Sequence, residues 1–368
     1  MKRSIIIFAT ILALFSLLPL TAYAADVSAR SAVLIEADSG EIIYEKNARE
    51  RMSMASTTKI MTALVALEHG KLDKKVTVAK EACGIEGSSI YLKSGEVLTL
   101  EDLLYAVMLE SANDAAAAVA CEIAGDIDSF AELMNETAEK IGLRDTHFTN
   151  PHGLDNEEHY TTAIDLAMLT AHAMKNEDFR RIVSTYKHEI PNSDGGVRYL
   201  VNHNKLLRLS DDVIGVKTGF TKRSGRCLVS AAERDGVSVI AVTLNAPDDW
   251  NDHLAMHEAG FAAYSTVTLA EAGEFTVEIP CVGAEDGHII LQNRDEITVC
   301  LKNGTEIKHE IIADRLLFPP IEIGDELGKV IFFSDGKEIA TLPLYATSNV
   351  SATEDTRSIF EKLSDVFR

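Results

Sequence analysis

Ser56 and Lys59 lie three residues apart in the segment ASTTKIMTALVALEHG, residues 55–70. Residues at positions i and i+3 of a helix are neighbours on one face, so this spacing predicts that the two side chains touch. A serine hydroxyl becomes an effective nucleophile when a base removes its proton. A lysine serves as that base only if burial or a nearby positive charge disfavours its ammonium form. The pair is therefore a candidate for nucleophilic catalysis, whereas a Lys59 on a solvated face would be an ordinary surface charge.

Two more short motifs follow along the chain, Ser111-Ala-Asn113 and Lys217-Thr218-Gly219. The first falls in a predicted break between two helices, which suits side chains that point into a cleft, although helix capping is the simpler explanation for both residues. The second lies late on a predicted strand, where a glycine without Cβ lets a peptide-like ligand approach the strand edge. Lys217 and Thr218 could hold a carboxylate there, unless this is an ordinary edge strand ending in a turn. Each motif alone is weak, and the ordered set of three is specific.

Two features would help Ser56 and Lys59 to react. Lys217 lies on a predicted strand. Its positive charge, placed near that of Lys59, could lower the pKa of Lys59. Ser56 is predicted at the start of a helix, where its side chain can cap the first turn. Backbone N–H groups and the helix dipole at that end also favour a developing oxyanion.

The elements that must position these residues follow from the spacing of apolar side chains. Apolar residues recur at helical spacing after Ser56, and Gly70 ends that helix. The predicted strands form a hairpin over residues 31–47, a single strand over 211–221 and a second hairpin over 226–246. The other predicted helices are two over residues 99–124 and one each over 129–141, 161–175 and 252–264. Strands therefore lie at both ends of this part of the chain, and most of the helices lie between them. This order predicts an α+β fold, in which one antiparallel sheet is covered by helices.

Composition divides the chain into four parts. Residues 1–24 combine a basic start, an apolar run and a small-residue cleavage site, which predicts a secretory signal peptide and an exported protein. Residues 25–274 would form the catalytic domain. Residues 275–346, in which short apolar runs alternate with glycine turns, would form a small β-sandwich-like domain. Residues 347–368 are predicted to be a linker and an amphipathic helix, and residues 355–368 could touch a membrane, dock on the protein or fray.

Charge and cysteine content narrow the range of partners. The 368-residue chain has a formal net charge of -22, which disfavours nucleic acid and anionic lipid as partners. Its five cysteines include no Cys-x-x-Cys pair, so neither a zinc ribbon nor a thioredoxin-type site is expected. Cys281 and Cys300 lie in the same β-rich segment and could form a disulfide, with small buried thiols as an equal alternative.

Together, these blocks resemble the exported serine-type D-alanyl-D-alanine carboxypeptidases of the peptidase S11 family, the low-molecular-mass penicillin-binding proteins. The three motifs are typical of penicillin-binding proteins and class A β-lactamases. The resemblance covers nearly the whole chain, including the signal peptide, the small β domain and the terminal helix. Its most specific blocks are ASTTKIMTAL, ESANDAAAAVA, THFTNPHGLD, HYTTAIDLAML, VNHNKLL and GVKTGFTKRSGRCLVSAAERDG. The fold that it implies is β-lactamase/transpeptidase-like.

The resemblance implies a reaction in the cell wall, on the extracellular or periplasmic side of the membrane. The enzyme would remove the terminal D-alanine from peptidoglycan stem pentapeptides, without a metal or an organic cofactor, and β-lactam antibiotics would acylate it. Ser56 would attack the carbonyl between the two D-alanines, Lys59 would act as general base, and Ser111 would relay a proton to the leaving D-alanine.

The remaining motif residues would bind the substrate. By the same resemblance, Asn113 would contact the amide of the acyl chain, and Thr218 would contact the terminal carboxylate. Lys217 would supply electrostatic support, and Gly219 would let the peptide lie close. The backbone N–H groups of Ser56 and Phe220 would form the oxyanion hole.

Two departures from the family pattern are visible. Phe220 stands after Lys-Thr-Gly where some members carry histidine. The segment NAPDDWNDHLAMHEAGF lacks the arginine that some members place near the substrate carboxylate. A side-chain role at position 220 and the identity of a substitute for that arginine are therefore open.

Four alternative functions have some support. A β-lactamase needs a glutamate for deacylation, and Glu157 and Glu158 fall in a suitable loop, but in no matching motif. A DD-endopeptidase of the same fold would use the same residues. A metallopeptidase could use His253 and His257, although Leu254 occupies the position of the catalytic glutamate. A non-enzymatic cell-wall binding protein would have no need of Lys59.

Overall fold

The computed structural model describes residues 27–351, and these residues form two compact units. The first unit ends at Ala262 and leaves out residues 235–237, which group with the second unit from Ala263 onward. The predicted signal peptide and the predicted helix at residues 355–368 lie outside the described residues. Within residues 27–351, no helix is long and apolar enough to cross a membrane.

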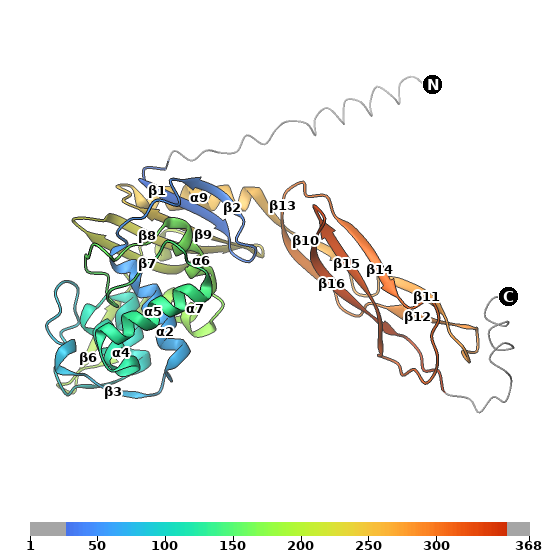
Figure 1. Cartoon of the computed structure of the whole chain (residues 1–368), viewed down its shortest axis with the longest axis horizontal. Coiled ribbons are helices and arrows are strands. Elements are labelled where there is room, and N and C mark those ends of the chain that lie inside the picture. Colours follow the sequence, from blue (N-terminus) through green and yellow to red (C-terminus); the bar gives the residue numbers. More distant parts are fainter. Residues whose placement is uncertain (1–26, 352–368) are drawn as a thin grey trace, which may run out of the picture. The chain divides into compact units, whose positions relative to one another are not determined.

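The first unit contains a five-stranded antiparallel sheet in the order β2-β1-β9-β8-β7 (Figure 1). The strands are β1 (Ser31–Glu36), β2 (Ile42–Lys46), β7 (Val213–Thr221), β8 (Gly225–Arg234) and β9 (Val237–Leu244). β1 pairs with β9 in a register that sets Val33 opposite Val242, so both ends of the segment meet in one sheet. The predicted hairpins and the single antiparallel sheet are therefore confirmed.

Helices cover both faces of this sheet. One face carries the block α2 (Lys59–His69), α3 (Leu100–Leu109), α4 (Asn113–Ala124), α5 (Ile127–Ile141), α6 (Ala163–Ala173) and α7 (Glu177–Ser184) (Figure 1). Side chains alternate across a strand, so Val33 and Ile35 of β1 enter the core with this block. Leu34 faces the opposite way, toward Gly260 of α9 (Asp249–Ala263). The sheet thus holds β7 as an edge strand beside the helix block, which is what positions Lys217.

Local signals account for several helix boundaries. Thr99 and Asp102 form the capping box that the sequence predicts at the start of α3. Thr162 caps α6 by accepting a hydrogen bond from the backbone N–H of Asp165. Ser56 does not cap α2, because the residues before this helix form a separate 3-10 turn, η1 (Ala55–Thr58), and no side-chain cap is present. The expectation of a Ser56 cap was therefore wrong.

Short elements complete the first unit. They are the pair β3 (Lys75–Thr77) and β4 (Val97–Thr99), the pair β5 (Lys187–Pro191) and β6 (Val197–Val201), the turn η2 (Lys80–Ala82) and the short helix α8 (Leu206–Leu209). β6 is joined to β7 through residues 202–212, which include α8. α8 packs against β7.

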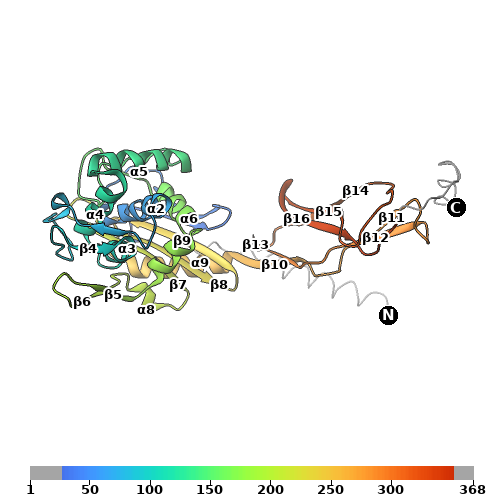
Figure 2. The same cartoon turned by 90° about the horizontal axis from the view of Figure 1, so that it is seen from below.

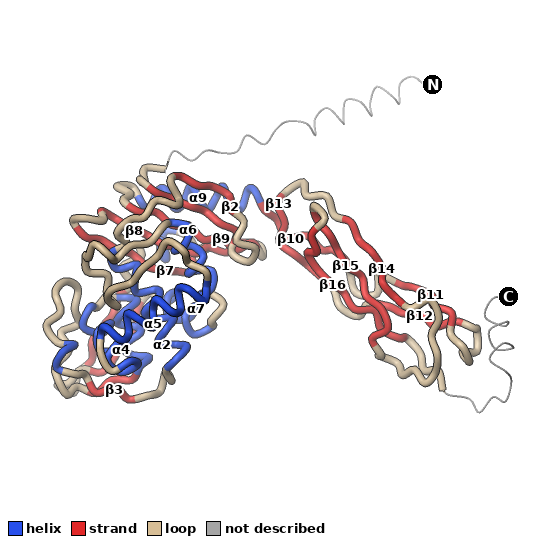
Figure 3. Tube along the Cα trace, viewed as in Figure 1, coloured by secondary structure: helices blue, strands red, loops and turns tan. Residues whose placement is uncertain are grey.

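The second unit consists of strands and loops from Tyr264 to Ser351 (Figure 3). β10 (Tyr264–Ala270) pairs with β13 (Ile297–Lys302), and a five-stranded sheet has the order β11-β12-β16-β15-β14. The five strands are β11 (Thr276–Pro280), β12 (His288–Gln292), β14 (Lys308–Ala313), β15 (Glu326–Ser334) and β16 (Lys337–Ala346). Cys281 is fully buried in the core of this unit, and Cys300 lies on β13. No disulfide joins Cys281 to Cys300 in the described structure.

Candidate active site

Ser56 lies in the turn η1, immediately before α2. Ala55, the residue before it, has a φ of 47°, which places it in the left-handed region. Thr57 donates its hydroxyl to the carbonyl of Met54 at 2.6 Å, and Thr58 donates its hydroxyl to the carbonyl of Ala55 at 2.8 Å. These two side-chain hydrogen bonds stabilise the turn that contains the left-handed Ala55. Neither bond uses the hydroxyl of Ser56, which therefore remains available as a nucleophile.

His159 supports the same turn from a distant loop. Its Nδ1 accepts the backbone N–H of Thr149 at 3.0 Å, so Nδ1 carries no proton. Its Nε2 therefore carries the proton and donates to Thr58 Oγ1 at 2.8 Å. Burial lowers the pKa of His159 to about 4, which keeps the ring neutral. The chain of bonds from Thr149 through His159 and Thr58 to Ala55 fixes the residue before the nucleophile.

Lys59 lies against Ser56, as the spacing predicts. Its Nζ is 3.0 Å from Ser56 Oγ, 2.7 Å from Asn113 Oδ1 and 2.5 Å from the carbonyl of His152. The side chain is fully buried. When Lys59 is an ammonium ion, its three N–H groups donate to these three oxygen atoms. When Lys59 is neutral, its two N–H groups can donate to Asn113 Oδ1 and to the carbonyl of His152, and its lone pair then faces the hydroxyl of Ser56. The geometry therefore suits proton transfer from Ser56 to Lys59.

The electrostatic surroundings favour the neutral form of Lys59. Burial is the main cause that lowers its pKa well below 10.5, and the charge of Lys217 lowers it further, while Asp114 opposes both. Lys217 is itself buried, and burial lowers its pKa to about 7, against the influence of Glu110. Below about pH 7, Lys217 therefore supplies the second positive charge that the sequence suggested.

Ser111 and Asn113 stand at the start of α4. The residue at the N-cap is Ala112, and no side chain caps the helix, so capping does not explain either residue. Ser111 has a φ of 59° and is almost fully buried. Asn113 bonds Lys59 through Oδ1, and its Nδ2 donates to the carbonyl of Glu86 at 2.5 Å. An amide nitrogen has two N–H groups, so the second remains for a ligand.

The strand β7 brings Lys217, Thr218 and Gly219 to the nucleophile. Lys217 Nζ donates to the carbonyl of Thr218 at 2.9 Å. A Cβ at Gly219 would be 3.0 Å from the backbone nitrogen of Ser56, so only glycine lets the strand lie this close. Thr218 is half-buried, and Phe220 is 67% exposed. The structure therefore brings all three motifs together around Ser56.

Three supporting residues were missed by sequence reasoning. Asp114 accepts hydrogen bonds from Ser89 Oγ and from backbone N–H groups of the same loop, which ties that loop to α4. Gly153 has a φ of 88°, and a Cβ there would lie 2.0 Å from the carbonyl of Ala55. Asp155 accepts from Ser53 Oγ at 2.9 Å and from Thr221 Oγ1 at 3.0 Å. Their only sequence signal was their position beside or within the blocks ESANDAAAAVA and THFTNPHGLD.

The glutamates and histidines considered for other functions lie elsewhere. Glu157 and Glu158 are exposed, and among the described residues no hydrogen bond joins either carboxylate to Ser56 or Lys59. His253 and His257 both bond Ser230 Oγ, at 2.6 Å and 2.7 Å, on the α9 side of the sheet. Residues 27–351 contain no group of three or more His, Cys, Asp or Glu that could hold a metal ion.

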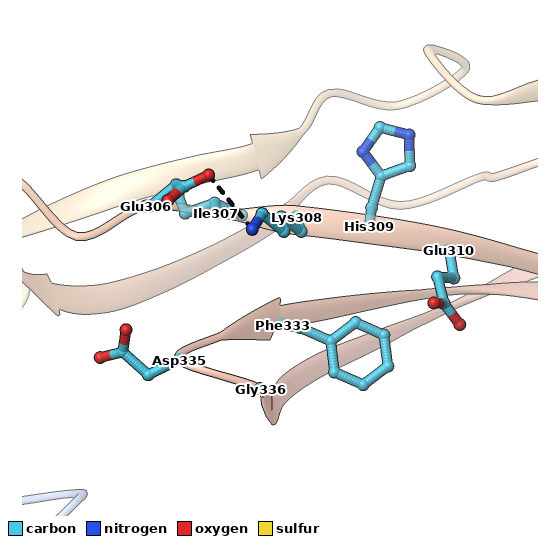
Figure 4. Close-up of a pocket in the computed structure, with 8 residues that line it drawn as sticks. All are labelled: Glu306, Ile307, Lys308, His309, Glu310, Phe333, Asp335 and Gly336. Carbon is cyan, nitrogen blue, oxygen red and sulfur yellow. Dashed lines mark ion pairs between the residues drawn. The ribbon is translucent and has the colours of Figure 1, made fainter.

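A hollow in the second unit contains none of the motif residues. It has a volume of about 760 Å³ and is lined by Glu306, Ile307, Lys308, His309, Glu310, Phe333, Asp335 and Gly336 (Figure 4). Glu306 and Lys308 face each other there at 3.4 Å, and both are largely exposed. A solvated ion pair of this kind contributes little, and none of the motif residues lies there, so the candidate active site remains the one around Ser56.

Comparison with known proteins identifies relatives of this chain. Residues 19–248 match the D-alanyl-D-alanine carboxypeptidase family, peptidase S11, and residues 264–352 match the C-terminal domain of penicillin-binding protein 5. The carboxypeptidase DacF of Bacillus subtilis is 34% identical over 88% of this chain and 86% of its own length. DacC of Escherichia coli is 32% identical over 90% of this chain and 86% of its own length. Penicillin-binding protein 5 of Haemophilus influenzae has a solved structure with a TM-score of 0.64 and 29% identity, covering 89% of this chain and 98% of that one.

The fold and the matched families define a serine enzyme of the penicillin-binding and transpeptidase class. The chain belongs to the D-alanyl-D-alanine carboxypeptidase family, peptidase S11. It is a serine-type D-alanyl-D-alanine carboxypeptidase with a role in peptidoglycan metabolism. The resemblance and the α+β fold expected from the sequence are both confirmed.

Proposed function

We propose that the protein removes the terminal D-alanine from peptidoglycan stem pentapeptides through a covalent acyl-enzyme on Ser56. The contact of 3.0 Å between Ser56 Oγ and the buried Nζ of Lys59 carries this proposal. Neutral Lys59 takes the proton of Ser56 as Oγ attacks the carbonyl between the two D-alanines. The C–N bond then breaks, and Ser111 relays a proton to the nitrogen of the leaving D-alanine.

The surrounding motif residues hold the substrate. Asn113 offers its free N–H to the carbonyl of the acyl chain, in addition to positioning Lys59. Thr218 and Lys217 bind the terminal carboxylate of the leaving D-alanine. The peptide lies along β7 at Gly219, and the backbone N–H groups of Ser56 and Phe220 stabilise the developing oxyanion.

Hydrolysis of the ester by water completes the cycle and restores Ser56. A β-lactam follows the same first step, because Ser56 can attack its strained amide carbonyl. The leaving nitrogen of a β-lactam stays attached to the acyl group, so it still occupies the leaving-group side of the cleft. We therefore expect a long-lived adduct on Ser56 and inhibition by penicillin.

The location of this reaction follows from the two ends of the chain. Residues 1–24 have the pattern of a cleaved signal peptide, which supports export to the extracellular or periplasmic side of the membrane. Residues 25–274 would then be the catalytic domain and residues 275–346 the accessory β domain. Residues 355–368 would provide peripheral membrane contact through an amphipathic helix.

One experiment tests the proposed reaction. The mature protein is incubated with a stem pentapeptide, free D-alanine is measured, and a penicillin-labelled sample is mapped by tryptic digestion in parallel. We expect release of D-alanine and a label on the peptide that contains Ser56, with both lost in Ser56→Ala. Thr57→Ser is the control, because it keeps the hydroxyl of the same turn. D-alanine release or labelling that persists in Ser56→Ala would contradict the proposal.

A further inference from the structure

We propose that Glu110 is a positioning residue of this active site, which ties the Ser111 side of the site to the strand that carries Lys217 and supplies a negative charge to Lys217. This inference rests on the proposed function, because Glu110 would act through two residues of that reaction. Glu110 ends α3 and directly precedes Ser111 in the chain. Among the described residues, no hydrogen bond joins its carboxylate to the nucleophile Ser56, so its role is indirect.

Two contacts hold the Glu110 carboxylate against residues 201–203. Oε1 accepts the backbone N–H of Val201 at 2.7 Å, and Oε2 lies 3.3 Å from Nε2 of His203. The backbone N–H of His203 also donates to the carbonyl of Leu109 at 3.3 Å. The Glu110 side chain is only 27% exposed. The carboxylate is therefore fixed beside the start of the Ser111 motif, unlike an ordinary surface charge.

The same segment continues to the strand that carries Lys217. Asn204 is fully buried, and its Nδ2 donates to the carbonyl of Gly215 at 2.9 Å. α3 packs against β5 and β6, and α8 packs against β7 (Figure 2). Residues 201–204 thus connect the residue before Ser111 to a point two residues before Lys217.

Lys217 is a buried cation that needs a nearby negative charge. Its Nζ donates to the carbonyl of Thr218, and within residues 27–351 no carboxylate forms an ion pair with it. Burial lowers the pKa of Lys217 to about 7, and the charge of Glu110 raises this pKa against the effect of burial. Loss of that charge would lower the pKa further, so Lys217 would lose its proton at a lower pH.

The other elements that pack against β7 supply no negative charge to Lys217 within the part of the chain that the structure describes. The turn η1 holds no titratable side chain, and β8 places Val229 opposite Lys217. α2 contributes Lys59, a like charge, and Asp114 acts on Lys59. The arginines of α7 and α8 contact other groups: Arg180 pairs with Glu233, Arg181 with Glu101, and Arg208 donates to the hydroxyl of Tyr186.

The proposed reaction needs a protonated Lys217 for two reasons. The ammonium group binds the terminal carboxylate of the substrate, and its charge lowers the pKa of Lys59. A neutral side chain at position 110 would lower the pKa of Lys217, and a smaller fraction of Lys217 would then be protonated at a given pH. The loss should be small at pH 6, where Lys217 is mostly protonated, and larger at pH 8. A purely structural role of Glu110 would instead lower activity equally at both pH values.

The test measures kcat/KM for release of D-alanine from a stem pentapeptide at pH 6 and pH 8. Glu110→Gln keeps an oxygen acceptor for the N–H of Val201 and removes the charge. Its matched control is Glu101→Gln, which removes a carboxylate of the same helix that pairs with Arg181. We expect Glu110→Gln to stay within about twofold of wild type at pH 6 and to be roughly threefold to tenfold lower at pH 8, mainly through KM, because a shift of one pKa unit changes the protonated fraction about tenfold. The control should stay within about twofold at both pH values.

A second variant tests the structural tie. Glu110→Ala removes the acceptor of the Val201 N–H together with the charge. We expect it to lower kcat at pH 6 as well, by roughly threefold to tenfold, because the connection between Ser111 and residues 201–204 is weakened. Equal activity of Glu110→Ala and Glu110→Gln at pH 6 would exclude this tie.

Other outcomes would overturn the role of the charge. An equal loss at pH 6 and pH 8 in Glu110→Gln would mean that Glu110 acts through packing alone, and activity like wild type at both pH values would mean that its charge has no effect on Lys217. Titration of active sites with labelled penicillin at each pH corrects for unfolded protein, so the comparison holds for a poorly folding variant. A wild-type protein that releases no D-alanine would instead contradict the proposed function itself.

Discussion

Gly219 lies directly against Ser56, so that a Cβ at position 219 would stand 3.0 Å from the backbone nitrogen of Ser56 and 3.1 Å from that of Thr57. The nucleophile and the strand that carries Lys217 are therefore in contact through backbone alone. This contact joins residues that are far apart in the sequence, and it holds β7 close to the turn that carries Ser56.

Replacement of Gly219 by alanine should slow acylation. The added Cβ meets backbone atoms of η1, so β7 must move by several tenths of an ångström away from Ser56. Misplacement of reacting groups costs roughly tenfold to hundredfold in rate. The second-order rate of penicillin labelling would measure the change. Gly196→Ala is the control, because a Cβ at Gly196 has nothing within 4 Å; equal labelling rates for both variants would refute the close-contact argument.

The pH dependence of acylation should report the charge of Lys217. Lys59 must be neutral to act as base, and the positive charge of Lys217 helps to lower its pKa. Replacement of Lys217 by methionine removes that charge, so the pKa of Lys59 rises and the acid limb of the pH–rate profile moves to higher pH. Rates of penicillin acylation between pH 5 and 10 would show the shift. An unmoved limb would mean that burial alone controls Lys59.

Replacement of Lys59 by arginine keeps the positive charge but should remove the general base. Arginine stays protonated at all working pH values, so proton transfer from Ser56 would fail. Loss of a general base typically costs about 10²–10⁴-fold in rate. Acylation rates and the midpoint of thermal unfolding should be measured together, because a buried guanidinium can also destabilise the fold. Near-normal acylation in Lys59→Arg would exclude Lys59 as the base.

His159 can be tested with two variants that each keep one of its hydrogen bonds. A glutamine can place an N–H near the position of Nε2 and keep the donation to Thr58. An asparagine can place an oxygen near Nδ1 and keep the bond from Thr149, but it cannot reach Thr58. If the Thr58 bond positions the turn, His159→Asn should lose roughly threefold to tenfold in kcat with little change in KM, and His159→Gln should retain more activity. The opposite order would assign the effect to the Thr149 bond.

The buried histidines should make the protein less stable in acid. Burial lowers the pKa of His257 to about 4 and lowers the pKa of His253 well below 6.5, so both stay neutral against Ser230 in the folded protein. The unfolded chain binds protons from about pH 6.5 downward, near the ordinary histidine pKa. The free energy of unfolding should therefore be highest above pH 6.5 and fall as the pH drops toward 4.

Chemical denaturation at several pH values would measure this slope. His257→Gln should flatten it, while substitution of the exposed His69 should leave it unchanged. Asp212 and Glu258 raise the pKa of His257 and Arg234 lowers it, so these neighbours should be kept intact in the comparison. A slope that His257→Gln leaves unaltered would show that other groups control acid stability.

The sequence by itself determined the elements and the reactive pair. Helical periodicity after Ser56, the glycine at position 70 and the two hairpins were enough to predict an α+β fold with one antiparallel sheet, and all are local patterns. The spacing of Ser56 and Lys59 predicted their contact, because i and i+3 neighbours are set by helix geometry alone.

Only the tertiary structure decided the state of that pair. The low pKa of Lys59 comes from burial and from Lys217, and its Nζ is held by Asn113 and by the carbonyl of His152. Burial and electrostatic interactions depend on distances in space, and these partners lie 54 and 93 residues away along the chain. For the same reason, no local pattern distinguished a capping Asn113 from one that holds Lys59, or showed that His159 supports the residue before the nucleophile.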